Sequence, residues 1–405
     1  MIIAIADDLI GAVEVAGIGH AHGLSTTVLT DLTDNLPVCD LMVVATQTRK
    51  MSENAAVAET HMICDQIKQG LPKLTEARHA AMTPLQRAQA LSRPSEVLHI
   101  YKKTDELLRG HVHLELRALV EESRYEQVIY VPANPSKGQT IRGGRYFVQG
   151  TPIDQTKYKS DPDYPIQTAN VADAIGVRPG SRLRIADAED QQDIQRAVKL
   201  ALNNHTPTLL AGSTDLFAAL LTELGHKTTR HKQFGGLSEK GPLLLIASRT
   251  PSSELITAPY LQRHATTLAT MPQEVYELSA TEKITVKDAT DRWMGRLKQS
   301  QVVSGKATSV MLAVPYPTPE TQSGEASVAQ VTAEMAQRIV LQQTLGELVI
   351  EGGTLAMATM RKLGWTRFMV TQVVAPGVVR MHCLNATHTH MTLVANGSSW
   401  EELLQ

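Results

Sequence analysis

Cysteine and long apolar runs are both scarce in this chain. The three cysteines in 405 residues, Cys39, Cys64 and Cys383, are odd in number and far apart, so no disulfide framework and no paired metal or redox motif is predicted. No stretch approaches the ~20 apolar residues of a membrane span, and the amino terminus lacks the pattern of a signal peptide. We therefore expect a cytoplasmic protein without a membrane partner.

An excess of charge is missing as well. Lys and Arg number 39 and Asp and Glu number 41, which gives a formal net charge of -2. Such a nearly neutral chain offers no electrostatic reason to bind nucleic acid or a membrane surface. We expect a globular protein whose partners are small molecules, with a homodimer left open as its assembly.

The glycine motifs of two common nucleotide folds are also absent. Gly17, Gly19 and Gly23 resemble a dinucleotide fingerprint, but the third glycine comes one residue late and the group lies within a predicted helix. No Gly-x-x-x-x-Gly-Lys-Ser/Thr loop occurs. A nicotinamide enzyme is therefore disfavoured. Histidines such as His382 and His390 lack the spacing of a metal motif, and no metal site is predicted.

The pattern that is present alternates apolar strand segments with helical periodicity. This pattern is typical of an α/β protein with mainly parallel sheets flanked by helices, and the length predicts two domains. A basic, glycine-containing segment, 226–242, is the predicted linker between domains 1–225 and 243–405. Helices are expected over 52–69, 83–91, 254–263, 324–345 and 357–363. Residues 70–95, which contain Pro72, are otherwise expected to be irregular, and their role is not predicted.

The most informative stretch is a buried strand that ends in Asp7 and Asp8, with Gly11 opening the next helix. Ligands bind at the carboxyl ends of strands in open parallel sheets. In one interpretation, one of the two carboxylates simply caps the helix. In the functional interpretation, Asp8 accepts a hydrogen bond or a proton from a substrate hydroxyl, and Asp7 caps or supports it.

Two further strands deliver charged side chains to the same predicted edge. Arg49 follows the strand 41–45 and could hold a carboxylate with two parallel hydrogen bonds, although an arginine there is also a common surface residue. The run 102–109, Lys-Lys-Thr-Asp-Glu-Leu-Leu-Arg, is predicted at the exit of the strand 97–101. Cations and an aspartate together suit an anionic, hydroxylated molecule, and a salt-bridged helix entrance is the alternative.

The second domain contains turns that suit phosphate. Ser248 follows the buried strand 243–247, and Gly352 and Gly353 lie between the strand 348–351 and a helix. Glycine lets backbone amides approach a phosphate closely, and a helix amino terminus favours negative charge. Either turn alone is weak support for a nucleotide site.

Taken together, these motifs resemble the four-carbon acid sugar kinase family along the whole chain. The resemblance is carried by the order and spacing of 6–12 (ADDLIGA), 46–49 (TQTR), 102–110 (KKTDELLRG), 132–138 (PANPSKG), 151–162, 212–213, 352–353, 363–365 and 375–377. The resemblance implies an amino-terminal substrate domain and a carboxyl-terminal ATP domain, with the active site in the cleft between them. It also implies ATP-dependent transfer of a phosphoryl group, with Mg²⁺, to the terminal hydroxyl of threonate, erythronate or 3-oxo-tetronate.

The resemblance and the chemistry of the strand ends together give candidate residues in both domains. The catalytic candidates are Asp8 and Asp105; the substrate-binding candidates are Asp7, Arg49, Lys103, Thr104 and Arg109; and the nucleotide-binding candidates are Ser248, Gly352, Gly353, Thr354 and Gly397. The chain departs from the family pattern at Ile10, Glu106, Leu107, Ala247 and Leu355, and lacks a lysine near 395–400. These departures motivate an alternative function, a sugar-acid binding or regulatory relative with an eroded ATP site.

Overall fold

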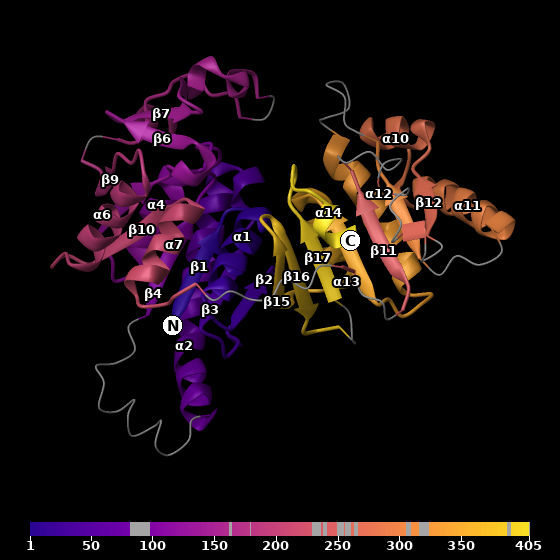
Figure 1. Cartoon of the computed structure of the whole chain (residues 1–405), viewed down its shortest axis with the longest axis horizontal. Helices are drawn as coiled ribbons and strands as arrows, with labels where there is room; N and C mark the ends of the chain where they lie inside the picture. The colour runs from indigo at the N-terminus through magenta and orange to yellow at the C-terminus, as the bar shows by residue number, and fades with distance from the viewer. Residues whose placement is uncertain are drawn as a thin grey trace. The chain divides into compact units, whose positions relative to one another are not determined.

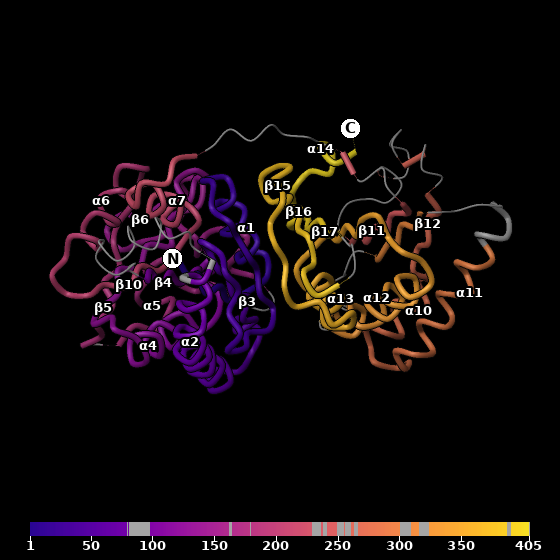
Figure 2. Tube along the Cα trace, turned by 90° about the horizontal axis from the view of Figure 1, so that it is seen from below, coloured from indigo at the N-terminus to yellow at the C-terminus, as the bar shows by residue number. Residues whose placement is uncertain are grey.

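The computed structural model divides the chain into two compact units, Met1–Arg230 and His231–Gln405 (Figures 1 and 2). It describes the chain except for residues 82–97, 162–163, 179, 229–235, 238–240, 249–254, 256–260, 263–265, 305–308, 316–323, 387–389 and 405. The helix expected over 83–91, most of the helix expected over 254–263 and much of the expected linker 226–242 lie outside the described residues. None of the described helices has the length and apolar character needed to cross a membrane.

The first unit is built on a parallel sheet whose strand order is β2-β3-β1-β4-β10-β5-β9. The strands are β1 (Ile2–Ala6), β2 (Thr26–Leu29), β3 (Leu41–Ala45), β4 (His99–Lys103), β5 (Gln127–Val131), β9 (Leu183–Ile185) and β10 (Thr208–Gly212). Every residue of β1 is buried, as expected for an apolar strand in the middle of a sheet that is covered on both faces. The α/β class with parallel strands is confirmed.

Two groups of helices cover this sheet (Figure 1). On one side α1 (Leu9–Ala21) packs against α7 (Thr214–Glu223), which packs against α6 (Gln191–Leu202); on the other, α2 (Glu53–Ala81) packs against α4 (Val112–Glu122). The remaining elements follow β5 and include a small antiparallel sheet of β6 (Gln139–Arg142), β7 (Arg145–Val148) and β8 (Thr151–Pro152). β6 and β7 form a hairpin that turns at Gly143 and Gly144.

Helix α2 is longer than the sequence predicted. The expected helix ended at residue 69, yet α2 continues through Pro72 to Ala81. Ile63, Ile67 and Leu74 are each at most 4% exposed and lie on one face of the helix, together with buried Gly70. Burial of this continuous apolar stripe offsets the hydrogen bond that proline cannot donate, so tertiary packing overrides the local helix-breaking signal.

The second unit has a mixed sheet of strand order β12-β13-β11-β14-β17-β16-β15. Its strands are β11 (Leu243–Ala247), β12 (Thr267–Thr270), β13 (Val310–Ala313), β14 (Glu347–Glu351), β15 (Arg367–Ala375), β16 (Val378–Cys383) and β17 (His390–Val394). The first five in the sheet order are parallel, and β17, β16 and β15 are joined by antiparallel pairing. The antiparallel strands were not predicted from the sequence.

Helices α10 (Gln273–Ala280), α11 (Val286–Ser304), α12 (Glu325–Val340) and α13 (Gly353–Leu363) pack together in this unit (Figures 1 and 2). A separate core lies beneath α14 (Glu401–Leu404), where Trp400 and Leu403 meet Leu245 and Val378. The helix expected over 324–345 ends earlier, at Val340. The helix expected to begin at residue 357 begins earlier, at Gly353. Leu355 and Ala356 are buried, so burial favours a helix that already includes them.

Candidate functional site

The two aspartates after β1 have different structural roles. Asp8 is the N-cap of α1, in an extended conformation, and its Oδ1 accepts a hydrogen bond of 2.8 Å from the Gly11 amide. Asp7 is 2% exposed and makes no such cap. The suggestion that Asp7 could cap the helix is therefore wrong, because Asp8 immediately precedes the first helical residue and its side chain alone reaches the open amides.

Arg49 joins three carboxylates at the carboxyl edge of the sheet. It lies in the short 3₁₀ helix η1 (Thr48–Lys50) after β3, and β3 is paired with β1. Its Nε and Nη2 donate to the two carboxylate oxygens of Asp7, both at 2.9 Å. Its Nη1 donates to Asp8 Oδ2 at 2.8 Å and lies 3.3 Å from Asp105 Oδ1. Arg49 thus orients the acid cluster that surrounds it.

Asp105 and Arg109 form a second two-pronged ion pair. Nε and Nη2 of Arg109 donate to the two oxygens of Asp105 at 2.7 and 2.8 Å. The Leu107 amide adds a hydrogen bond of 3.1 Å to Asp105 Oδ2. The Arg109 side chain is 29% exposed, compared with 12% for Arg49, so Arg109 is the more accessible cation.

Lys102 and Lys103 lie within β4 rather than after it, which corrects the predicted strand end. Consecutive residues of a strand point to opposite faces, and the two lysines do so. Lys103 faces α1, because a Cβ added to Gly11 of that helix would lie 3.4 Å from the Lys103 Nζ. The same Nζ lies 2.8 Å from Glu106 Oε1. Lys102 faces α4, where its Nζ donates to Glu115 Oε2 at 2.6 Å.

Several supporting residues were missed in the sequence. Glu115 is buried and also accepts a hydrogen bond of 2.8 Å from Thr48, the neighbour of Arg49. The hydroxyl of Tyr164 donates to the Arg49 carbonyl. Asn134, fully buried, bonds to Thr214 at the start of α7. The adjacent lysines in β4, read with strand alternation, could have predicted a buried partner for Lys102; the other contacts join distant segments and carry no local signal.

The cluster gives its carboxylates different basicities. Burial raises the pKa of Asp8, and Asp7 raises it further, while Arg49 opposes both. Burial would also raise the pKa of Asp105, but Arg49 and Arg109 outweigh it and hold that pKa well below its ordinary range. Asp8 is therefore the better proton acceptor of the two catalytic candidates. Burial lowers the pKa of Lys103, yet Glu106, Glu14 and Asp7 outweigh it, so Lys103 is charged.

In the second unit, the predicted nucleotide-binding residues share one sheet edge. Ser248, Gly352 and Gly397 follow β11, β14 and β17, which are adjacent parallel strands. Gly352 has φ 89°, and a Cβ placed on it would lie 2.8 Å from Asn396 Oδ1 and 3.8 Å from Ser248 Oγ. Ser248, Gly352 and Asn396 are therefore neighbours. Asn396 is added to the candidate nucleotide-binding residues.

The start of α13 suits an anion. Gly353 and Thr354 form its first turn, and its N-cap residue, Gly352, has no side chain that could cap it. Uncapped amides at a helix amino terminus bind phosphate oxygens. The Ser248 amide already donates to Glu351 Oε2 at 2.9 Å, which leaves the Ser248 hydroxyl as its group for a ligand. Among the described residues, no group of three or more His, Cys, Asp or Glu could hold a metal ion by protein ligands alone.

Comparisons with known proteins find relatives that are named as kinases of four-carbon sugar acids. Residues 2–180 match a family model described as a sugar-binding N-terminal domain. The D-threonate kinase of Salmonella typhimurium is 21% identical over 92% of this chain and 89% of its own length. The 3-oxo-tetronate kinase of Brucella melitensis is 22% identical over 92% of this chain and 87% of its own. The D-threonate kinase of Cupriavidus necator is 28% identical over 53% of this chain and 52% of its own.

Solved structures show the same fold. A protein of Salmonella typhimurium has a TM-score of 0.72 at 16% identity, covering 100% of this chain and 97% of that one. A protein of Haemophilus influenzae has a TM-score of 0.66 at 16% identity, covering 98% and 97%. The resemblance predicted from the sequence agrees with these comparisons: the chain is similar to curated kinases of four-carbon sugar acids, and relatives of this kind indicate a phosphotransferase.

Proposed function

We propose that the protein transfers the γ-phosphoryl group of ATP to the terminal hydroxyl of a four-carbon sugar acid, with threonate, erythronate and 3-oxo-tetronate as the candidate acceptors. The names of relatives that align with 92% of this chain support this substrate class. One observation carries the proposal: Asp8 is half-buried at the end of a strand and is held there by Arg49. A carboxylate in this position can accept the proton of a substrate hydroxyl.

Asp8 orients and deprotonates the acceptor hydroxyl. Its Oδ1 is engaged by the Gly11 amide and its Oδ2 by Arg49, so both oxygens are fixed before a substrate arrives. A positioned base of raised pKa is more effective than one that stays ionised at every pH. Asp105, whose pKa is depressed by Arg49 and Arg109, instead positions Arg109 and accepts hydrogen bonds from substrate hydroxyls.

Arg109 holds the acid group of the substrate. Its contact with Asp105 uses Nε and Nη2 and leaves Nη1 for a second carboxylate. Arg49 has Asp7, Asp8 and Asp105 around it, so its role is chiefly to hold these aspartates in place. Lys103 and Thr104, both 1% exposed, are the remaining polar candidates for substrate binding at this edge of the sheet.

The nucleotide phosphates bind at the start of α13. The amides of Gly353 and Thr354, the Ser248 hydroxyl and the backbone near Gly397 are the groups that would hold them. Mg²⁺ that arrives on the triphosphate would neutralise its charge, since Mg²⁺ in kinase sites is held mainly by phosphates, water and one or two carboxylates. Transfer then requires the acceptor oxygen and the γ-phosphorus to be aligned within bonding distance.

A coupled ADP-release assay with Mg²⁺ and ATP tests the proposal. The panel contains D-threonate, D-erythronate, L-threonate and the 3-oxo four-carbon acids, and turnover on one of them is expected. Silence across the panel from folded protein would contradict the proposed acceptor. Calorimetry with Mg²⁺ and ATP separates this outcome from the alternative, a binding or regulatory relative, which the comparisons do not favour and which requires that ATP does not bind.

A further inference from the structure

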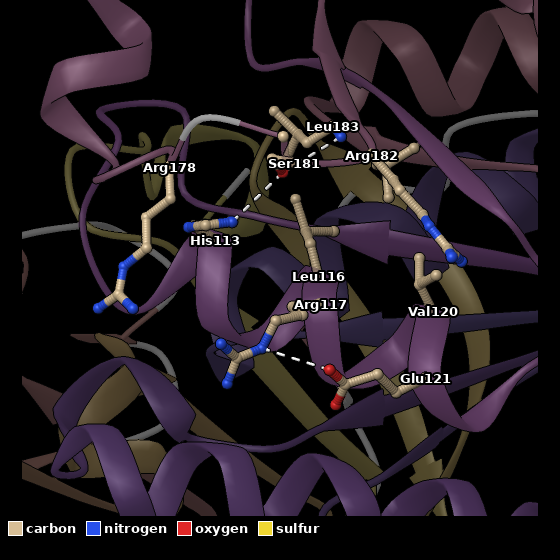
Figure 3. Close-up of a pocket in the computed structure, with 11 residues that line it drawn as sticks. His113, Leu116, Arg117, Val120, Glu121, Arg178, Ser181, Arg182 and Leu183 are labelled. Atoms are coloured by element: carbon tan, nitrogen blue, oxygen red, sulfur yellow. Dashed lines mark hydrogen bonds and ion pairs between the residues drawn. The ribbon is translucent and has the colours of Figure 1, made fainter.

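A cavity of about 420 Å³ lies in the first unit and contains none of the predicted site residues. One wall is the face of α4 that carries His113, Leu116 and Val120, and the opposite wall is the segment 180–183 that leads into β9 (Figure 3). Sites for small organic molecules span roughly 300–1,000 Å³, so this cavity is large enough to hold one.

The floor of the cavity is apolar. Leu116 and Val128 are 1% and 3% exposed, while Val120 and Leu183 are half-buried and complete the apolar lining. β9 is the last strand in the sheet order of this unit and has only three residues. The lining therefore offers an apolar ligand a surface from which water can be displaced.

The rim of the cavity is cationic. It carries Arg117, Arg178 and Arg182 and a single carboxylate, Glu121, which lies 3.5 Å from Arg117. Within the described part of the chain, Arg178 and Arg182 have no ion-pair partner. Figure 3 shows them on either side of Leu116. In a chain of formal net charge -2, this local positive excess points to an anionic ligand, because guanidinium groups bind carboxylate and phosphate oxygens in pairs.

A polar pair, the buried His113 and the half-buried Ser181, lies at one end of the cavity. His113 is 8% exposed, and its Nδ1 donates to the Gly176 carbonyl at 2.9 Å. A carbonyl only accepts, so Nδ1 carries the proton and Nε2 is left as an acceptor for the Ser181 hydroxyl at 3.4 Å (Figure 3). This last contact is long, and a ligand hydroxyl or amine could replace it without loss.

We propose that this cavity binds a small organic anion with an apolar body. Leu116, Val120, Val128 and Leu183 contact the body, and Arg178 and Arg182 bind the acid group. The site is separate from the acid cluster around Arg49, so the proposal does not depend on which acceptor the enzyme phosphorylates. The acid group can be a carboxylate or a phosphate ester, which the guanidinium groups recognise by the same oxygen pairs.

The first test titrates the full chain with 8-anilinonaphthalene-1-sulfonate and follows its fluorescence. We expect saturable binding at one site that weakens roughly tenfold or more in the double variant Arg178→Gln/Arg182→Gln, since hydrogen bonds to charged groups are lost. The matched control is Arg142→Gln/Arg196→Gln, which removes two exposed arginines outside the cavity and should bind like the wild type. Equal binding by the first double variant and the wild type would overturn the proposal.

A second test distinguishes the two acid groups and checks the apolar floor. Benzoate and phenyl phosphate are used as competitors, and the one that displaces the dye at lower concentration identifies the preferred group. Failure of both to displace it would contradict the site. Val120→Trp fills the cavity without changing charge and should prevent binding while the melting temperature shows an intact fold. Should that variant not fold, calorimetry of phenyl phosphate with the arginine variants decides: heat of equal size in all of them rules the site out.

Discussion

Arg49 binds Asp7 through two parallel hydrogen bonds, Nε to Oδ2 and Nη2 to Oδ1, both 2.9 Å long, although 42 residues separate them in the chain. Both side chains are largely buried, at 12% and 3% exposure. The pair positions the whole acid cluster. With Nε and Nη2 bound to Asp7, the remaining donor group of Arg49, Nη1, reaches Asp8 and Asp105.

The first prediction concerns this pair. Arg49→Gln leaves the buried Asp7 carboxylate without its partner and should lower the free energy of unfolding by about 3 kcal/mol. The double variant Asp7→Asn/Arg49→Gln removes both charges and should recover part of that loss. Urea unfolding measures both. Lys199→Gln, which breaks an exposed ion pair with Glu223, is the control and should leave stability unchanged. A double variant that loses as much stability as Arg49→Gln alone, or more, would refute this account.

The second prediction concerns Asp8. Asp8→Asn should reduce kcat at least about a hundredfold, since asparagine cannot accept the proton of the acceptor hydroxyl. The fold should be kept, because asparagine caps a helix as well as aspartate. Asp190→Asn is the matched control: it changes the N-cap of another helix, α6, which makes no contact with Arg49 or its aspartates among the hydrogen bonds and ion pairs given above, and should leave kcat unaltered. Near-normal turnover by Asp8→Asn would remove this residue from the mechanism.

The third prediction is the pH dependence of kcat/KM. Asp8 acts when it is deprotonated, so activity should rise with pH through the pKa of Asp8. Burial raises that pKa, which places the rise above the range of an ordinary aspartate. Asp105 stays ionised across this range because Arg49 and Arg109 depress its pKa, so it should add no second limb. A pH profile of kcat/KM for the acceptor, measured at saturating ATP, tests this. If the same rise with pH persists in the residual activity of Asp8→Asn, the titrating group is not Asp8.

The fourth prediction concerns the two ends of α13. Gly352→Ala places a Cβ 2.8 Å from Asn396 Oδ1 at φ 89°, so it should raise the KM for ATP as well as cost about 1–3 kcal/mol of stability. Gly364→Ala is the control at the other end of the same helix: it has φ 69° but open space around its Cβ. It should cost stability alone. Equal effects of the two substitutions on the KM for ATP would argue against nucleotide binding at Gly352.

The sequence predicted the elements of this protein better than their ends. Apolar strands such as β1 and β3 were predictable because they are short and each is followed by polar residues. The extension of α2 past Pro72 was not, because it depends on burial of Leu74 against distant segments. The antiparallel strands β15 and β16 were not predicted either, although the Pro-Gly pair between them marks a turn.

The sequence by itself determined the chemistry available at the edges of the two sheets. Asp8, Arg49, Asp105 and the Gly352 turn each follow a strand, and parallel strands bring such residues to one edge whatever the details of packing. Only the tertiary structure decided how the roles divide. It made Asp8 rather than Asp7 the helix cap and gave Asp8 a higher pKa than Asp105. Burial and charged neighbours set basicity, and both the burial and the distant neighbour Arg49 come from the fold.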